Sequence, residues 1–129
     1  MKLVRKYGSG NLTTYVYEDE TIHDQAAAIG RIAAMAGCED FAPGYIALRD
    51  LQHSAGEGSE SCQLPPDAAP EEIRRSLAEH PCGKLYLSGR FEGARAGIGI
   101  DLQHFELFIT LADADEGRMA RLLQLTAGR

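Results

Sequence analysis

The chain has 129 residues, of which 44% are hydrophobic, and a formal net charge of −6. This length and apolar content predict one domain with a hydrophobic core of its own. Nucleic-acid binders need clustered Lys and Arg, and this chain has 13 basic against 19 acidic residues, so we expect no nucleic-acid partner. The sequence has no signal-peptide pattern and no window of about 18 apolar residues, and it predicts a soluble, cytoplasmic protein with no membrane partner.

The first predicted elements are a β-hairpin and a helix. Residues 2–7 and 12–18 flank a loop rich in Gly, Ser and Asn, a composition typical of a hairpin turn. Thr21 is the expected helix N-cap, with Asp24 three residues later in the capping-box position, and Gly37 marks the C-terminal end. The helix between these signals is rich in alanine. It also contains a glycine, Gly30, which costs roughly 1 kcal/mol relative to alanine and therefore suggests close packing against another element.

The middle of the chain predicts a short strand, a long loop and a second helix. Pro43-Gly44 introduces the strand, which we expect over 45–51. Gly, Ser, Glu and Pro dominate residues 52–67, which predicts a flexible loop. Pro70 is typical of the first turn of a helix, and Pro81 should follow its end.

The C-terminal third is the most informative part, because it predicts three antiparallel strands in a defined register. If Glu92-Gly93 forms a two-residue hairpin loop, Leu87 faces Ile98. A second tight turn at Leu102-Gln103 would place Leu107 beside Ile98. Side chains alternate with period two along a strand, so one set of apolar residues shares the core face. This set is Leu85, Leu87, Phe91, Ala94, Ala96, Ile98, Ile100, Phe105, Leu107 and Ile109.

A last helix is expected after Asp113, with Glu116 in a capping position. The predicted order β-β-α-β-α-β-β-β-α indicates an α+β fold. We expect a single domain over 1–129, built on a largely antiparallel sheet that two to three helices cover on one face. The sheet would comprise the N-terminal hairpin, one short strand and the C-terminal three-strand meander.

The sheet face opposite the predicted core is the candidate binding surface. Gly97 and Gly99 would form a shallow channel on its middle strand, and glycines in a strand often mark a place where a ligand or another backbone comes close. Three occupants of the channel remain open: the alanine-rich helix, a partner chain or second copy, and a small ligand. Arg90 and Arg95 would face each other as a like-charge pair, which is unfavourable unless an acid relieves it.

No residue cluster matches a catalytic or metal-binding motif. The only close pair of zinc-type ligands is His80-Pro81-Cys82, for which a structural role at a helix end is the alternative. Three cysteines at wide spacings fit no disulfide framework, so we expect reduced thiols, no metal and no cofactor. His104 and Glu106 are a candidate acid/base pair beside Asp101, against the alternative of an ordinary solvated sheet face. We assign no catalytic residue.

These observations predict a small acidic interaction or regulatory module that binds a protein partner, or a second copy of itself, through the sheet face. An inhibitor or immunity-type protein that neutralises a basic partner is a specific version of this function. The alternative is a small enzyme or small-ligand-binding domain that uses the same face, so the sequence leaves open whether the protein is an enzyme. The candidate binding residues are Tyr86, Arg90, Arg95, Gly97, Gly99, His104, Glu106 and Phe108.

Overall fold

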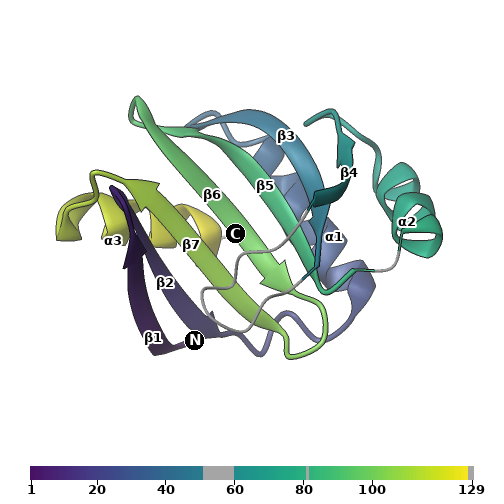
Figure 1. The fold of residues 1–129 in the computed structure, drawn as a ribbon, viewed down its shortest axis with the longest axis horizontal. Coiled ribbons are helices and arrows are strands. Elements are labelled where there is room, and N and C mark those ends of the chain that lie inside the picture. The colour runs from purple at the N-terminus through teal and green to yellow at the C-terminus, as the bar shows by residue number, and fades with distance from the viewer. Residues whose placement is uncertain (51–59, 81, 128–129) are drawn as a thin grey trace.

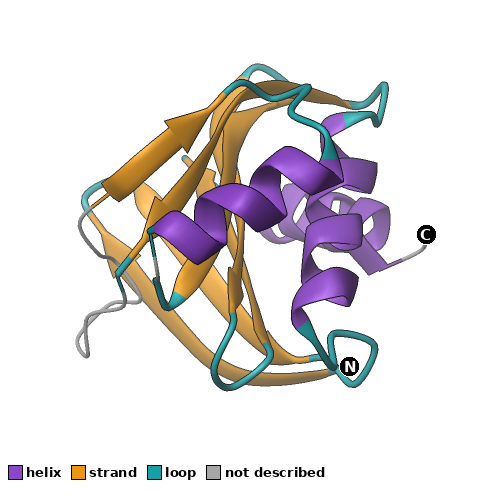
Figure 2. Ribbon diagram, turned by 90° about the vertical axis from the view of Figure 1, so that its right-hand side faces the viewer, coloured by secondary structure: helices purple, strands orange, loops and turns teal. Residues whose placement is uncertain are grey.

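The computed structural model describes residues 1–50, 60–80 and 82–127. They form a seven-stranded antiparallel sheet in the order β1-β2-β7-β6-β5-β3-β4 (Figure 1). Three helices gather on one side of this sheet (Figure 2). The predicted α+β class, with a hairpin, a meander and helices on one face, is confirmed. The strands are β1 (Lys2–Ser9), β2 (Leu12–Glu18), β3 (Phe41–Arg49), β4 (Glu60–Leu64), β5 (Lys84–Phe91), β6 (Ala94–Asp101) and β7 (Glu106–Ala112), and the helices are α1 (Gln25–Ala36), α2 (Pro70–Glu79) and α3 (Glu116–Ala127).

The β5–β6 hairpin has the predicted register. Leu87 pairs with Ile98, and Phe91 pairs with Ala94 across the turn. Glu92 and Gly93 both have positive φ, 51° and 82°, as a type I′ turn requires. This turn matches the right-handed twist of the strands, and it fixes which face each side chain of the hairpin occupies.

The β6–β7 connection differs from the prediction. Residues 102–105 form a four-residue loop in place of the expected two-residue turn, and Ile98 pairs with Ile109 instead of Leu107. Asp101 explains the longer loop, because its Oδ1 accepts hydrogen bonds from the backbone N–H groups of Gln103 at 2.8 Å and His104 at 3.0 Å. The register is therefore shifted by two residues. A two-residue shift preserves the side-chain faces, so the predicted core face is correct.

The main core lies between the sheet and the helices. Leu87, Ile98, Leu107 and Ile109 are fully buried there, as the alternation predicts. Helix α1 packs on β3 and β5, whereas α3 packs on β7. We call this side of the sheet the helix-covered face and the opposite side the helix-free face.

Helix α1 begins later than predicted. Asp24, not Thr21, is the N-cap, because its Oδ1 accepts a hydrogen bond of 2.7 Å from the backbone N–H of Ala27. Thr21 instead donates through both its backbone N–H and its hydroxyl to Oδ1 of Asp19. The expectation that Gly30 packs closely is wrong, since Gly30 is exposed and a Cβ there would meet no atom within 4 Å.

Arg31 of α1 ties this helix to α3 and to the end of β2. Its guanidinium donates hydrogen bonds of 2.9 Å to Oδ2 of Asp19 and of 2.7 Å to the backbone carbonyl of Thr126. The Asp19 side chain is only 5% exposed. Burial by itself raises the pKa of this carboxyl, but the hydrogen bonds from Thr21 and the charge of Arg31 outweigh that effect and hold the pKa below its usual value.

The strand predicted over 45–51 is longer and starts earlier, at Phe41. Residues 60–64, predicted as part of a loop, form β4, which pairs with β3. Strand β4 is short and polar, so its composition resembles that of a loop. The remainder of the predicted flexible loop consists of residues 51–59, outside the described residues, and residues 65–67, which lead into α2.

Candidate functional site

Seven of the eight predicted binding residues lie on the helix-free face, at alternating positions of β5, β6 and β7. The eighth, His104, lies in the loop between β6 and β7. The structure places these residues at different depths. Tyr86, Gly97, Gly99 and Phe108 are buried, Glu106 is partly buried, and Arg90, Arg95 and His104 are exposed.

The glycine channel is filled by side chains of the neighbouring strand. A Cβ at Gly97 would overlap the Tyr86 hydroxyl, and a Cβ at Gly99 would overlap Cε of Lys84. Strand β6 therefore carries glycines so that Tyr86 and Lys84 can lie across its backbone. Of the three expected occupants, the alanine-rich helix is wrong, because α1 packs on the other face. Side chains of β5 cover the two glycines instead.

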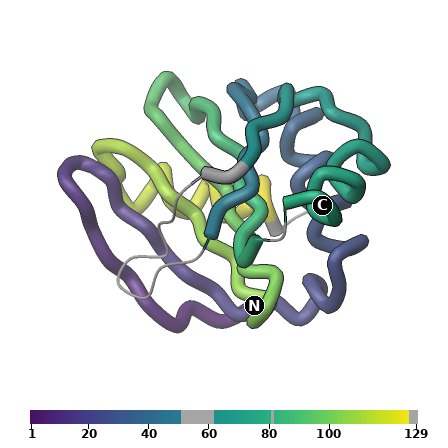
Figure 3. Tube along the Cα trace, turned by 45° about the vertical axis from the view of Figure 1, so that its right-hand side comes forward, coloured from purple at the N-terminus to yellow at the C-terminus, as the bar shows by residue number. Residues whose placement is uncertain are grey.

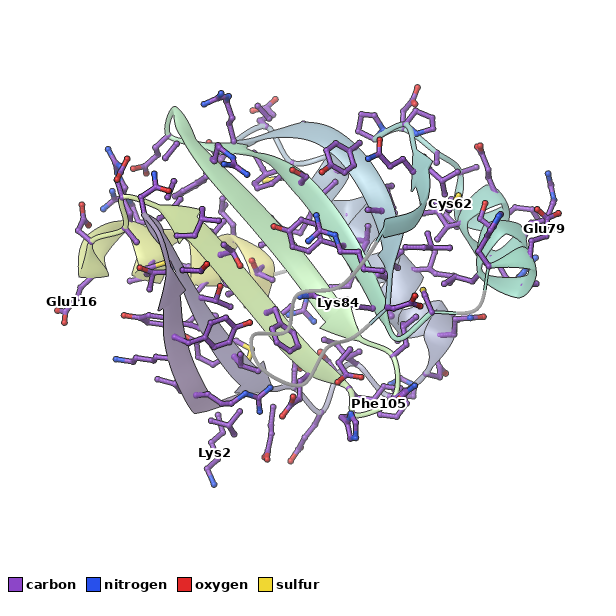
Figure 4. All side chains as sticks on the ribbon, viewed as in Figure 1. Lys2, Cys62, Glu79, Lys84, Phe105 and Glu116 are labelled. Atoms are coloured by element: carbon purple, nitrogen blue, oxygen red, sulfur yellow. The ribbon has the colours of Figure 1, made fainter. Side chains whose placement is uncertain are left out.

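Tyr86 and Phe108 form the centre of a stack of aromatic rings and cations. The Arg49 guanidinium carbon lies 3.9 Å from the centroid of the Tyr86 ring. The Lys84 amino nitrogen lies 4.2 Å from the Phe108 centroid and 5.4 Å from that of Tyr86. Lys84 is 4% exposed and lies near the middle of this face (Figure 4). Cation–π contacts strengthen when desolvated, so this stack stabilises the sheet and holds positive charge on its helix-free face.

The hydroxyl of Tyr86 is also held in place. It lies over Gly97, whose partner on β7 is Thr110, and Oγ1 of Thr110 lies 2.9 Å from Oγ1 of Thr14. Burial raises the pKa of the Tyr86 phenol, and the nearby Tyr45 adds to this, while Arg49 and Arg95 oppose it. Tyr86 is therefore a neutral, fixed side chain at neutral pH and has a structural role.

At one edge of this face, Arg5 of β1 and Glu106 of β7 form an ion pair. Two guanidinium nitrogens of Arg5 donate to the two carboxylate oxygens of Glu106, at 2.9 and 3.3 Å. The Glu106 side chain is 16% exposed. A carboxylate committed to a bidentate arginine pair is a poor general base, so the predicted His104–Glu106 acid/base pair lacks one of its members.

The Arg90–Arg95 pair is an exposed, positively charged feature of this face. The two residues pair directly across β5 and β6, as the register predicts. Arg90 donates to the backbone carbonyl of Gly93 at 3.1 Å, and neither arginine makes an ion pair with a described acidic residue. Like charges opposite each other in a sheet are destabilising, and an anion placed between the two guanidinium groups would relieve their repulsion.

Asp101 and His104 make the other notable contact. Oδ2 of the buried Asp101 lies 2.9 Å from Nδ1 of His104, while the imidazole itself is largely exposed. The hydrogen bond to Asp101 and its negative charge raise the pKa of His104. The contact leaves Nε2 at the solvent-exposed end of the ring, where a proton can be exchanged. The main role of Asp101 is nevertheless to order its own loop.

Charge is distributed unevenly between the sheet and the rest of the molecule. The seven strands contain seven of the 13 Lys and Arg residues but only four of the 19 Asp and Glu residues. The strands are therefore net +3, and the remaining chain is net −9, within the total of −6. The net charge of the whole chain does not show this segregation. Three further cations on the helix-free face, Arg5, Arg49 and Lys84, were not among the predicted binding residues.

Among the residues that the structure describes, no three metal-ligating side chains gather into a metal site, and no helix is long and apolar enough to cross a membrane. No family model, curated protein or solved structure matches the chain.

Proposed function

We propose that this protein is an interaction module that binds an acidic partner protein through the helix-free face of its sheet. The observation that carries the proposal is the exposed Arg90–Arg95 pair, because it lies on the basic side of an otherwise acidic molecule. Arginine side chains bind carboxylates in bidentate geometry, and arginine is enriched in protein interfaces.

The buried side chains of this face support the proposal, because they give the face a rigid structure. Lys84, Tyr86 and Phe108 are fixed by their contacts with one another, and Lys84 adds positive charge to the same face as the exposed arginines, at the other end of β5. Side chains fixed before binding lose little conformational entropy in the complex. A rigid, positively charged sheet face is therefore suited to fast, charge-steered association with an acidic surface.

A basic partner would have to bind elsewhere. The inhibitor or immunity-type version of the function needs an acidic surface, and the acidic residues of this chain lie mostly outside the strands. Helix α2, for example, carries two acidic residues in its first turn. The charge distribution favours an acidic partner for the sheet face and leaves the helix layer for a basic one.

The test is a comparison of two charge reversals of equal size. Arg90→Glu combined with Arg95→Glu changes the helix-free face, and Arg74→Glu combined with Arg75→Glu changes two exposed residues of α2. Each tagged protein is incubated with an extract of its source cells, and the recovered proteins are quantified by mass spectrometry. We expect an acidic protein that the wild type and the α2 variant recover and that the sheet variant loses at least tenfold. Equal recovery by all three proteins would contradict the proposal.

The enzyme alternative has one specific observation in its favour, the 2.9 Å contact between Asp101 and His104. A carboxylate that orients an imidazole is a recurrent general-base arrangement. The two functions are separable, because His104→Gln would abolish catalysis by this residue but would leave binding at Arg90 and Arg95 unchanged.

A further inference from the structure

We infer that the outer edge of β1 is a second interaction surface, which takes up an extended segment of a partner protein as an additional strand. The segment would alternate acidic and apolar residues. This inference is independent of the proposed function, because β1 is separated from the strands of Arg90 and Arg95 by β2 and β7. Strand β1 lies at one end of the sheet, and β3 and β4 lie at the other end.

Strand β1 is an edge strand. It pairs with β2 on one side, and no strand of the described residues pairs with its other side. Figure 3 shows β1, in purple, at the margin of the molecule away from α2. The backbone of an edge strand offers a row of hydrogen-bonding groups, which is the basis of recognition by strand addition.

Exposed apolar surface also concentrates at this edge. Among the described residues, the large hydrophobic side chains classed as exposed are Met1 at 53% and Leu3 at 39%. Leu3 pairs with the core residue Tyr17, so its side chain belongs to the helix-covered face. An added strand would therefore bury an apolar side chain beside Leu3.

The other face of the same edge is positively charged. Lys2 pairs with Glu18 and Arg5 with Val16, which places both cations on the helix-free face. Lys2 points away from the body of the protein at the lower margin (Figure 4). Strand β1 contains three cations and no acidic residue. The Arg5 guanidinium is paired with Glu106 across β2, so an added strand would meet Lys2 on one face and Leu3 on the other. This combination selects an acidic residue beside Lys2 and an apolar residue beside Leu3.

A second copy of β1 is a poorer occupant. Antiparallel self-pairing would bring together two strands that each contain three cations and no acidic residue, and like charges on neighbouring strands are destabilising. Lysine side chains hinder an edge strand from pairing with a second copy of itself, and so does a register irregularity such as the one between Leu3 and Arg5. The same charges favour an acidic segment, so they select one partner chemistry while excluding self-association.

The probe is an eight-residue peptide in which glutamate alternates with valine, and its control is the same peptide with an N-methyl group on every internal amide. Both have the same charge, but the methylated peptide cannot complete a strand ladder. Binding is measured by fluorescence anisotropy, and the contacted residues are identified from backbone amide shifts. We expect the first peptide to bind and to shift the amides of Lys2–Lys6, and we expect the methylated peptide to bind at least tenfold more weakly.

Two variants test which face of β1 the peptide contacts. Lys2→Glu should weaken binding at least tenfold, whereas Lys6→Glu, on the helix-covered face, should weaken it less than threefold. The Arg90→Glu/Arg95→Glu protein should bind the peptide as the wild type does, so this test and that of the proposed function can fail separately. Equal binding of both peptides, no binding of either, or a β1-dependent dimer in light scattering would overturn the inference.

Discussion

The two faces of the sheet are buried in different ways. On the helix-covered face, aliphatic side chains such as Ile98 and Ile109 pack against helices. On the helix-free face, Tyr86, Phe108 and the cation Lys84 are buried around the glycines of β6, beside the partly buried Arg49. Packing on the first face requires only apolar side chains of suitable volume, whereas packing on the second face depends on particular side chains.

The largest expected effect is on the helix-covered face. Ile98→Ala should lower the free energy of unfolding by about 4 kcal/mol, because the side chain is fully buried and its removal leaves a cavity. Denaturant unfolding measures the loss. The control is Leu3→Ala on the exposed edge of the sheet, which should cost less than about 0.5 kcal/mol. A cost below about 1 kcal/mol for Ile98→Ala would mean that this face is not the main core.

The next largest loss of stability is expected from removing the contacts of Arg31, which join α1 to α3 and to the end of β2. Arg31→Met should lower the free energy of unfolding by about 3 kcal/mol, since it leaves the buried Asp19 carboxylate without its ion-pair partner. The same substitution at Arg74, in an exposed pair with Glu71, should cost about 0.5 kcal/mol or less.

The pH dependence of the Arg31→Met effect identifies its cause. The folded-state pKa of Asp19 is lowered, so its stabilising contribution is present above the unfolded-state pKa near 3.8 and is lost as the pH falls through the folded-state value. The difference between the wild type and the variant should therefore shrink below about pH 4. A difference that stays constant down to pH 2 would assign the effect to packing of the arginine side chain.

On the helix-free face, the test concerns the glycine that accommodates Tyr86. Gly97→Ala should cost about 2 kcal/mol, because the new Cβ overlaps the Tyr86 side chain. In a Tyr86→Phe background the cost should fall by at least about 0.5 kcal/mol, since the hydroxyl is the nearest atom. Equal costs in both backgrounds would show that Tyr86 does not lie over this strand.

The smallest effect is expected on the solvent side of α1. Gly30→Ala should raise the free energy of unfolding by about 1 kcal/mol, because the position is exposed, has room for a Cβ and lies inside a helix. Thermal unfolding measures the gain. A loss of stability would mean that the solvent side of α1 makes contacts in solution.

The sequence predicted the helix-covered face well, and the reasons are visible in particular residues. Glu92-Gly93 has the backbone conformation of a two-residue hairpin loop, so the pairing of Leu87 with Ile98 followed from local chemistry. The β6–β7 loop was missed because it depends on hydrogen bonds from the Asp101 side chain. The resulting error was two residues, which preserved the faces.

The helix-free face was predicted only in part. Alternation placed Tyr86, Gly97 and Phe108 on it, but no local rule shows that Tyr86 crosses to the neighbouring strand and covers the glycine. Arg5 and Arg49 were missed because their places on this face follow from strand order, with β1 and β3 far from β7 and β5 in sequence. The segregation of charge also becomes visible only once the strands are assigned.

The proposed binding role of the Arg90–Arg95 pair is tested most directly by one thermal unfolding experiment at low salt, with wild type and Arg95→Glu, each with and without a decaglutamate peptide. We predict that Arg95→Glu alone unfolds at a higher temperature than the wild type, because it turns a like-charge pair into an opposite-charge pair. We also predict that the peptide raises the unfolding temperature of the wild type only. A destabilised variant, or an equal response of both proteins to the peptide, would contradict a binding role for these two arginines.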